Sequence, residues 1–283
     1  KKSGALEVTS VGDLILYLLM NIPLYAALAV LTWKLGPDNL GMLGSSVSYL
    51  IYAVLLGLYL FQTARILQIN LSLFSEEVPE LERYSFRQVA ALNLSYMVTF
   101  GSELAIVSML ILFYQDTFAL SPVMAGLIAS IFAGLNIIMR PAGGWISDNF
   151  GRKRSLGMIM LGLVLGFLMM SQIDSSWSLP SAILVTIFCS LFVNAGNGAV
   201  FAMIPLVKRR LTGQIAGMTG AYGNVGAVTF LTVLSFVETE LFFLLIATTA
   251  VVTLVVILLF LEEPKGSMAE VLPDGTVELI KVD

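Results

Sequence analysis

Two ionisable side chains, Glu103 and Arg140, lie inside long apolar stretches of the sequence. On membrane-insertion scales a guanidinium in hydrocarbon costs about 2.5 to 3.5 kcal/mol, and arginine cannot escape that cost by losing its proton. Such residues usually face a polar cavity, a partner or a transported ion. We therefore expect Arg140 to face a cavity or a partner. Glu103 is a candidate proton carrier, with two structural alternatives: an ion pair with Arg140, or a cap formed by neighbouring hydroxyl groups.

Polar side chains recur on one face of the helix predicted around Glu103. Tyr96 and Thr99 precede Glu103 by seven and four residues. At about 100° per residue, the three side chains fall within a sector of roughly 60°. This spacing predicts that one face of the helix lines a polar space.

Asparagine and glycine residues mark two later apolar stretches. Asn194 and Asn197 lie three residues apart on one side of a predicted helix, where amides either hydrogen-bond to neighbouring helices or contact a polar substrate. The next stretch carries glycines at helical spacing: Gly213, Gly217, Gly220, Gly223 and Gly226. At about 100° per residue, the first four fall within roughly 120° of one another. The resulting groove serves either close helix packing or, with Asn224 beside it, the binding of a small ligand.

A basic segment follows Arg140 and is predicted to form a tight loop over residues 144–154. Its pattern, Gly-x-x-x-Asp-x-x-Gly-Arg-Lys-Arg, is formed by Gly144, Asp148, Gly151, Arg152, Lys153 and Arg154. An ordinary cytoplasmic loop requires basic residues, but neither the aspartate nor the glycines. The pattern resembles the signature loop of the major facilitator superfamily, which joins the second and third helices of each half. The resemblance implies that this loop gates the movement between inward-open and outward-open states.

Composition indicates an all-α integral membrane protein. Of the 283 residues, 58% are hydrophobic and 12% are charged, and the mean hydropathy is +0.91. Apolar runs of about twenty residues are long enough to cross a bilayer as helices. We predict eight membrane helices, at about 13–33, 43–67, 88–113, 120–146, 155–172, 180–206, 214–236 and 240–261.

The predicted helices fall into two groups joined by a polar connector. Residues 1–67 hold two transmembrane helices, either a hairpin inserted before the second half of a transporter or the end of a first half; we favour the extra N-terminal hairpin. Residues 68–87 form an acidic cytoplasmic connector, and residues 88–261 form a C-terminal six-helix half-bundle of the major facilitator type. Residues 262–283 form a cytoplasmic tail, whose end alternates like a β-strand. Most lysines and arginines lie in the segments assigned to the cytoplasmic side, as the positive-inside rule requires.

Four motifs resemble the nitrate/nitrite porter family. They are residues 95–101 around Tyr96, residues 139–141 around Arg140, residues 194–201, and the glycine-rich residues 217–226. The resemblance implies a planar anion held between two arginines, one from each half of the transporter. It assigns the substrate site of this chain to Arg140, Tyr96, Asn224, Gly220, Gly223 and Asn197. Only one such arginine is present, so we expect this chain to act with a missing N-terminal half of the same transporter.

These features predict a secondary active transporter that imports nitrate and nitrite with protons across the cytoplasmic membrane by alternating access. Glu103 is the proton-coupling candidate. At this position the antiporters of the family are apolar, and a carboxylate there resembles the proton-coupled members. The alternatives are a nitrate/nitrite antiporter and a transporter of another small anion; a non-transporting membrane module would have no need of Arg140. The sequence has no histidine, no phosphate-binding loop and no nucleophile motif. We therefore expect that the chain is not an enzyme and that it has no cofactor, no metal site and no nucleic-acid partner.

Overall fold

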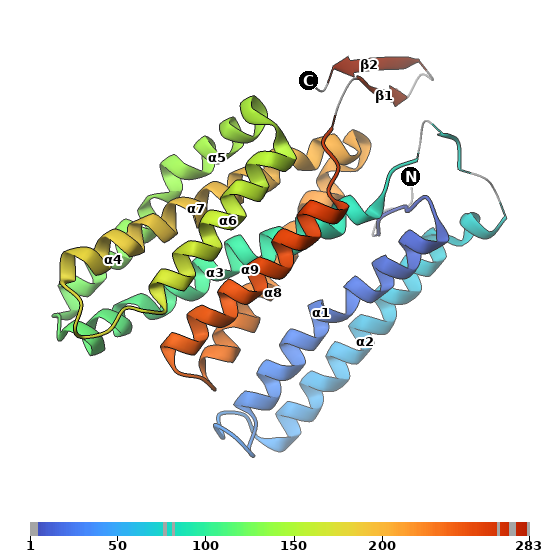
Figure 1. Ribbon diagram of the computed structural model, residues 1–283. Helices are drawn as coiled ribbons and strands as arrows, with labels where there is room; N and C mark the ends of the chain where they lie inside the picture. The colour runs from blue at the N-terminus through green and yellow to red at the C-terminus, as the bar shows by residue number, and fades with distance from the viewer. Residues whose placement is uncertain (1–4, 76–77, 81–82, 265–266, 272–275, 282–283) are drawn as a thin grey trace. The chain divides into compact units, whose positions relative to one another are not determined.

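The computed structural model describes residues 5–75, 78–80, 83–264, 267–271 and 276–281. The elements in chain order are α1 (Val11–Leu35), α2 (Ser45–Ile69), the 3₁₀ turn η1 (Leu71–Phe74), α3 (Phe86–Phe118), α4 (Pro122–Gly134), α5 (Asn136–Phe150), α6 (Arg152–Met170), α7 (Leu179–Val207), the 3₁₀ turn η3 (Arg209–Leu211), α8 (Thr212–Leu234), α9 (Thr239–Phe260), β1 (Ser267–Val271) and β2 (Val277–Lys281), as Figure 1 shows.

All eight predicted membrane helices are helical in the structure. Within the described residues, seven helical stretches are long and apolar enough to cross a membrane, with Pro122–Phe150 counted as one of them. The eighth, α8, has the predicted position but is not among the seven. Its many glycines and polar side chains lower its hydropathy, although its length of 23 residues suffices for a bilayer. The chain is thus a multi-pass helical membrane protein.

The fourth predicted helix is divided at Leu135 into α4 and α5. Kinks in long helices usually arise at proline or glycine. Gly134 is the last residue of α4, and Pro141 lies inside α5, where it cannot donate a hydrogen bond to the carbonyl one turn earlier. We attribute the break to these two residues. The break sets the direction of α5, which carries Arg140.

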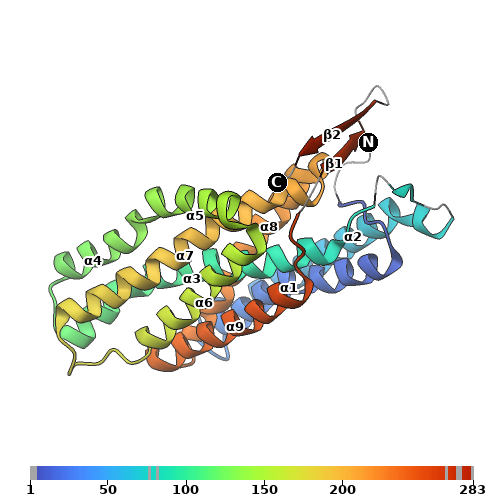
Figure 2. The same cartoon turned by 45° about the horizontal axis from the view of Figure 1, so that its top comes forward.

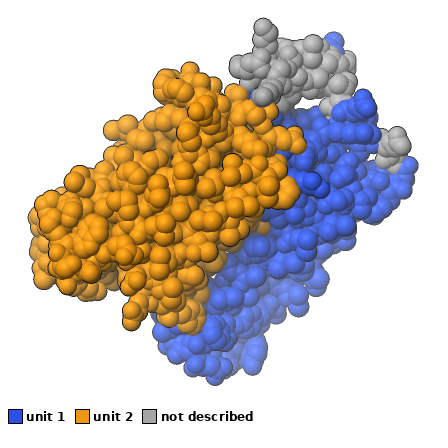
Figure 3. All heavy atoms as spheres, viewed as in Figure 1, with its two compact units in different colours: residues 1–90, 204–221, 264–283 blue, residues 91–203, 222–263 orange. Residues whose placement is uncertain are grey.

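The chain forms two compact units, coloured separately in Figure 3. The first contains residues 1–90, 204–221 and 264–283, and the second contains residues 91–203 and 222–263. Helices α3, α7 and α8 each contribute residues to both units.

In the first unit, α1 and α2 form a helical hairpin. The buried side chain of Asn70, just after α2, accepts a hydrogen bond from the backbone N–H of Val8 at 2.8 Å and donates one to the carbonyl of Leu6 at 3.0 Å. These hydrogen bonds link the segment that precedes α1 to the end of α2. Leu50, Leu60 and Phe61 are exposed on α2, as expected for a helix that faces lipid or another helix.

The acidic connector and the tail are each described only in part. Three of the connector's glutamates, Glu76, Glu77 and Glu82, lie outside the described residues. In the tail, β2 pairs with β1 in antiparallel register, from Ser267 opposite Lys281 to Val271 opposite Val277. The alternating pattern in the tail runs from Thr276 to Val282. The predicted strand is confirmed over Val277–Lys281, and Val282 lies outside the described residues.

Glycines bring helices of the second unit into close contact. A Cβ atom on Gly143 of α5 would collide with the carbonyl of Ala195 on α7, and one on Gly198 of α7 would collide with the carbonyl of Arg140. A Cβ atom on Gly101 of α3 would lie 2.7 Å from the backbone of Gly226 on α8. Helices α6 and α9 also lie side by side in both cartoon views (Figures 1 and 2). Small residues at membrane helix interfaces permit such approach, which here leaves little space between α5 and α7.

Candidate functional site

The guanidinium of Arg140 lies among three aromatic rings. Its central carbon is 6.0 Å from the ring centroids of both Tyr96 and Phe100, and 5.7 Å from that of Phe201. Its Nη2 donates a hydrogen bond to the Tyr96 hydroxyl at 2.7 Å. No carboxylate pairs with Arg140 among the described residues. The positive charge is therefore held in position by a neutral hydroxyl and ring faces, and it is available to an anion.

The rings around Arg140 form one packed group. Tyr96 and Phe100, one turn apart on α3, stack with centroids 5.0 Å apart and planes 4° apart. Phe201 of α7 meets Tyr96 edge-on at 4.9 Å. Tyr96 itself is buried, with 3% of its surface exposed. The predicted proximity of Tyr96 and Arg140 is thus present, whereas Phe100 and Phe201 were not singled out from the sequence.

Gly223 of α8 makes room for this aromatic group. A Cβ atom there would lie 2.7 Å from a ring atom of Tyr96 and 2.7 Å from one of Phe100. At Gly217 and Gly220, by contrast, a Cβ atom would meet no described atom within 4 Å. The glycine stripe therefore serves two purposes: its later part packs against α3, and its earlier part leaves an open surface. Asn224, next to Gly223, is exposed.

Glu103 lies between two asparagine amides. Its Oε1 accepts from Nδ2 of Asn136 at 2.5 Å, and its Oε2 accepts from Nδ2 of Asn197 at 2.6 Å. Glu103 is buried, with 7% exposed, and Asn197 is fully buried. Among the described residues Glu103 has neither the ion pair with Arg140 nor the hydroxyl cap considered for it; two amides hold its carboxylate instead. The structure places Asn197 at Glu103, not beside the Arg140 guanidinium.

Asn136 was missed in the sequence. The available signal was its position four residues before Arg140, which puts both side chains on one face of a helix. Asn194, by contrast, has the packing role considered for it: its Nδ2 donates to the carbonyl of Phe132 at 3.3 Å and to the hydroxyl of Ser190 at 2.9 Å.

The predicted loop over residues 144–154 is wrong in extent. Helix α5 continues to Phe150 and α6 begins at Arg152, so Gly151 alone forms the turn. Gly151 has φ of +89°, a conformation that side-chain-bearing residues rarely adopt. Asp148, on the last turn of α5, forms an ion pair with Arg152 at 3.4 Å across this turn. Gly144 lies within α5, and Arg154 is exposed on the first turn of α6.

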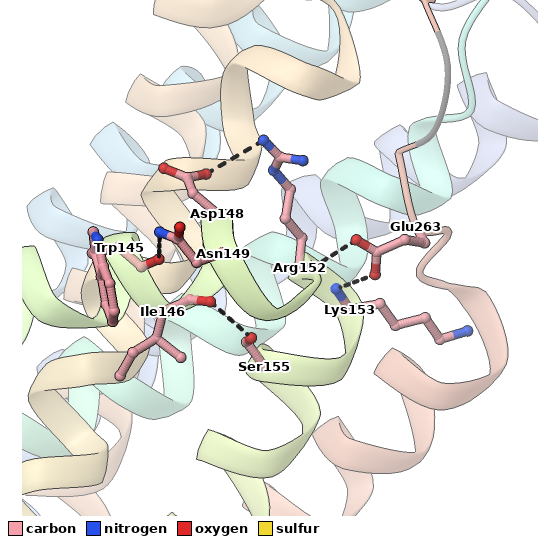
Figure 4. A network of polar contacts seen from close by, with 8 residues as sticks. All are labelled: Trp145, Ile146, Asp148, Asn149, Arg152, Lys153, Ser155 and Glu263. Atoms are coloured by element: carbon pink, nitrogen blue, oxygen red, sulfur yellow. Dashed lines mark hydrogen bonds and ion pairs between the residues drawn. The ribbon is translucent and has the colours of Figure 1, made fainter. Parts of the chain in front are cut away.

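A carboxylate from the end of α9 caps the start of α6 (Figure 4). Glu263 accepts hydrogen bonds from the backbone N–H groups of Arg152 at 2.6 Å and Lys153 at 2.7 Å. The Lys153 ammonium donates to the carbonyl of Leu258 at 2.9 Å. A negative charge at a helix N-terminus is stabilised by both the free N–H groups and the helix dipole. The acidic pair directly after the last apolar helix is visible in the sequence, but the helix that it caps is not.

The site thus combines an arginine held among aromatic rings, a separate buried carboxylate and a charged turn between two membrane helices. The sequence of residues 92–281 matches the family model described as Major Facilitator Superfamily. The chain belongs to this superfamily.

Curated relatives agree with the resemblance seen in the motifs. The chain is 42% identical over 272 residues to the nitrate/nitrite transporter NrtP of Nostoc punctiforme, covering 95% of the chain and 54% of that protein. It is 44% identical over 290 residues to NrtP of a Picosynechococcus species, with the same coverage of 95% and 54%. It is also 39% identical over 142 residues to the high-affinity nitrate transporter 2.3 of rice, covering 48% of the chain and 28% of that protein. The resemblance to the nitrate/nitrite porters is confirmed, and these relatives are transporters, not enzymes.

The chain spans about half the length of the two NrtP relatives that it matches, at 54% of each.

Proposed function

We propose that the protein containing this chain transports nitrate and nitrite across the cytoplasmic membrane, together with protons and by alternating access. The observation that carries this proposal is the Arg140 guanidinium, which donates to Tyr96 at 2.7 Å and pairs with no carboxylate among the described residues. Nitrate and nitrite are small planar anions, and a guanidinium offers them two parallel donors in one plane. The names of the NrtP relatives support the same substrates.

In this proposal each site residue has a distinct role. Arg140 binds the anion, and Tyr96 fixes the orientation of its guanidinium. Gly223 positions the Tyr96 and Phe100 rings by allowing α8 to approach them. Asn224, which is exposed next to Gly223, faces the anion or the first half of the transporter.

The turn around Gly151 provides the proposed gate at the cytoplasmic end. Asp148, Arg152 and Glu263 form its polar contacts, with the ion pair at 3.4 Å and the cap at 2.6 Å. The tail after α9 then lies on the cytoplasmic side, and an N-terminal half supplies the second arginine.

Substrate identity is tested by uptake of labelled nitrate into proteoliposomes that contain the transport-competent protein. Lysine in place of Arg140 keeps the charge but loses the planar pair of donors, so we expect uptake at nitrate concentrations below saturation to fall sharply. Unlabelled nitrite should compete with nitrate for uptake by the unaltered protein. Normal uptake by Arg140→Lys would refute the assigned role, and failure of nitrite to compete would favour a transporter of another small anion.

Proton coupling is tested in the same vesicles at internal pH 7.5, with and without an inward proton gradient. We expect the gradient to drive nitrate accumulation in the unaltered protein. Glu103→Gln should remove that drive and leave nitrate exchange intact, because glutamine is a permanent neutral replacement for the acid. If both proteins exchange nitrate for nitrite equally and ignore the gradient, the transporter is an antiporter and Glu103 is structural.

A further inference from the structure

The contacts of Glu103 fit its charged form. Both carboxylate oxygens accept from amide groups, Oε1 from Asn136 at 2.5 Å and Oε2 from Asn197 at 2.6 Å. A carboxylate is an acceptor only, whereas a protonated carboxyl group must also donate its O–H. Protonation would therefore place a donor against one of two amide N–H groups in a buried position, and an unmade buried hydrogen bond costs free energy.

The acceptor required by the protonated form is already present in Asn197. This side chain is fully buried, and its Oδ1 has no hydrogen-bond partner among the described residues. Rotation of the amide by a half-turn would exchange Nδ2 for Oδ1 beside Glu103, so that the carboxyl O–H could donate to it. Asn197 thus offers Nδ2 as a donor to the charged carboxylate of Glu103, and Oδ1 as an acceptor to its protonated form.

The second amide links Glu103 to the segment that carries Arg140. Asn136 is the first residue of α5, directly after the break at Leu135. Arg140 lies one helical turn later on the same face. The hydrogen bonds from Asn136 to Glu103 and from Arg140 to Tyr96 therefore both join α5 to α3.

We propose that Asn136 and Asn197 are positioning residues that transmit the protonation of Glu103 to the anion site. When a proton from solvent binds Oε2, the Asn197 amide turns to accept it, and the bond from Asn136 changes from charge-assisted to neutral. Bonds to charged groups are about twice as strong as neutral ones, so the start of α5 is held less firmly. This inference rests on the proposed proton-coupled function of Glu103 and adds the route by which the proton acts.

The charges around Glu103 determine the sign of the effect. Arg140 on α5 and the neutral Tyr96 on α3 are the ionisable groups on the face of contact; α7 contains no Asp, Glu, Lys, Arg, His or Tyr, and α8 contains only Tyr222 among these types. Protonation removes the one negative charge of this group. Nitrate affinity should therefore rise as pH falls, by at most about tenfold per pH unit for a single linked proton.

The test measures the nitrate dissociation constant of the purified protein as a function of pH, together with backbone hydrogen exchange at the start of α5. In the unaltered protein the nitrate dissociation constant should decrease as the pH decreases, and Glu103→Gln should abolish that dependence. Asn136→Ala should reduce the pH dependence by at least about half and increase hydrogen exchange over residues 136–140, as Glu103→Gln does.

Asn194→Ala is the matched control, since Asn194 is a buried amide one turn from Asn197 that binds Phe132 and Ser190. It should keep the pH dependence. Retention of the full dependence in Asn136→Ala, with binding weakened equally at every pH, would overturn the inference and leave proton coupling at Glu103 intact. A dependence that survives Glu103→Gln would overturn both. Absence of nitrate binding in the unaltered protein would instead refute the substrate assignment, and the inference with it.

Discussion

Replacing Glu263 by alanine removes the carboxylate that caps α6 at the charged turn. Two backbone N–H groups, those of Arg152 and Lys153, lose acceptors at 2.6 and 2.7 Å. Loss of an N-terminal cap costs about 0.5 to 2 kcal/mol, and loss of a negative charge near the helix dipole adds about 0.3 to 1 kcal/mol. We therefore expect the free energy of unfolding to fall by about 2 kcal/mol. Glu263→Gln keeps one carbonyl oxygen and should lose about half as much.

The assay is equilibrium unfolding by SDS in mixed detergent micelles, followed by tryptophan fluorescence. Asp38→Ala is the control, because it removes one negative charge from an exposed position between α1 and α2. Most surface substitutions change stability by less than about 0.5 kcal/mol. Equal stability of Glu263→Ala and Asp38→Ala would refute the cap as a stabilising contact of the turn.

Two further substitutions test the roles assigned to glycines. Gly223→Ala places a Cβ atom 2.7 Å from the Tyr96 ring. The overpacking should cost about 1 to 3 kcal/mol of stability and weaken nitrate binding. Gly217→Ala is the control and should bind nitrate normally, because no neighbouring atom of the described residues lies within 4 Å of its Cβ. Equal binding by both variants would exclude the packing role. Gly151→Ala should destabilise the protein by about 1 to 2 kcal/mol, because φ is +89° there. Gly44→Ala, at φ of −71°, serves as its control in the SDS unfolding assay, and an equal effect of the two would show that Gly151 is not conformationally required.

Helix positions were predictable because apolar runs of membrane length have few other solutions in lipid. The proximity of Tyr96 and Arg140 was predictable only through the family resemblance, since they lie 44 residues apart. Helix spacing placed Tyr96 and Glu103 on one face. The structure shows that Tyr96 contacts Arg140, whereas Glu103 contacts Asn136 and Asn197.

The missed features depend on contacts between distant parts of the chain. Glu263 caps a helix that begins 111 residues earlier, and no local pattern specifies that contact. Asn136 reaches Glu103 across 33 residues. The extent of the turn was missed for a local reason: a single glycine with positive φ suffices to reverse the chain, so the basic residues on both sides remain helical.

The central claim is that the planar guanidinium of Arg140 binds the anion through its paired donors. The most direct test is the equilibrium dissociation constant for nitrate in Arg140→Lys, compared with Arg154→Lys, which alters an exposed arginine on α6. Loss of a charge-assisted hydrogen bond of about 2 kcal/mol predicts roughly 30-fold weaker binding for Arg140→Lys and no change for Arg154→Lys. Unchanged affinity in Arg140→Lys would contradict the claim.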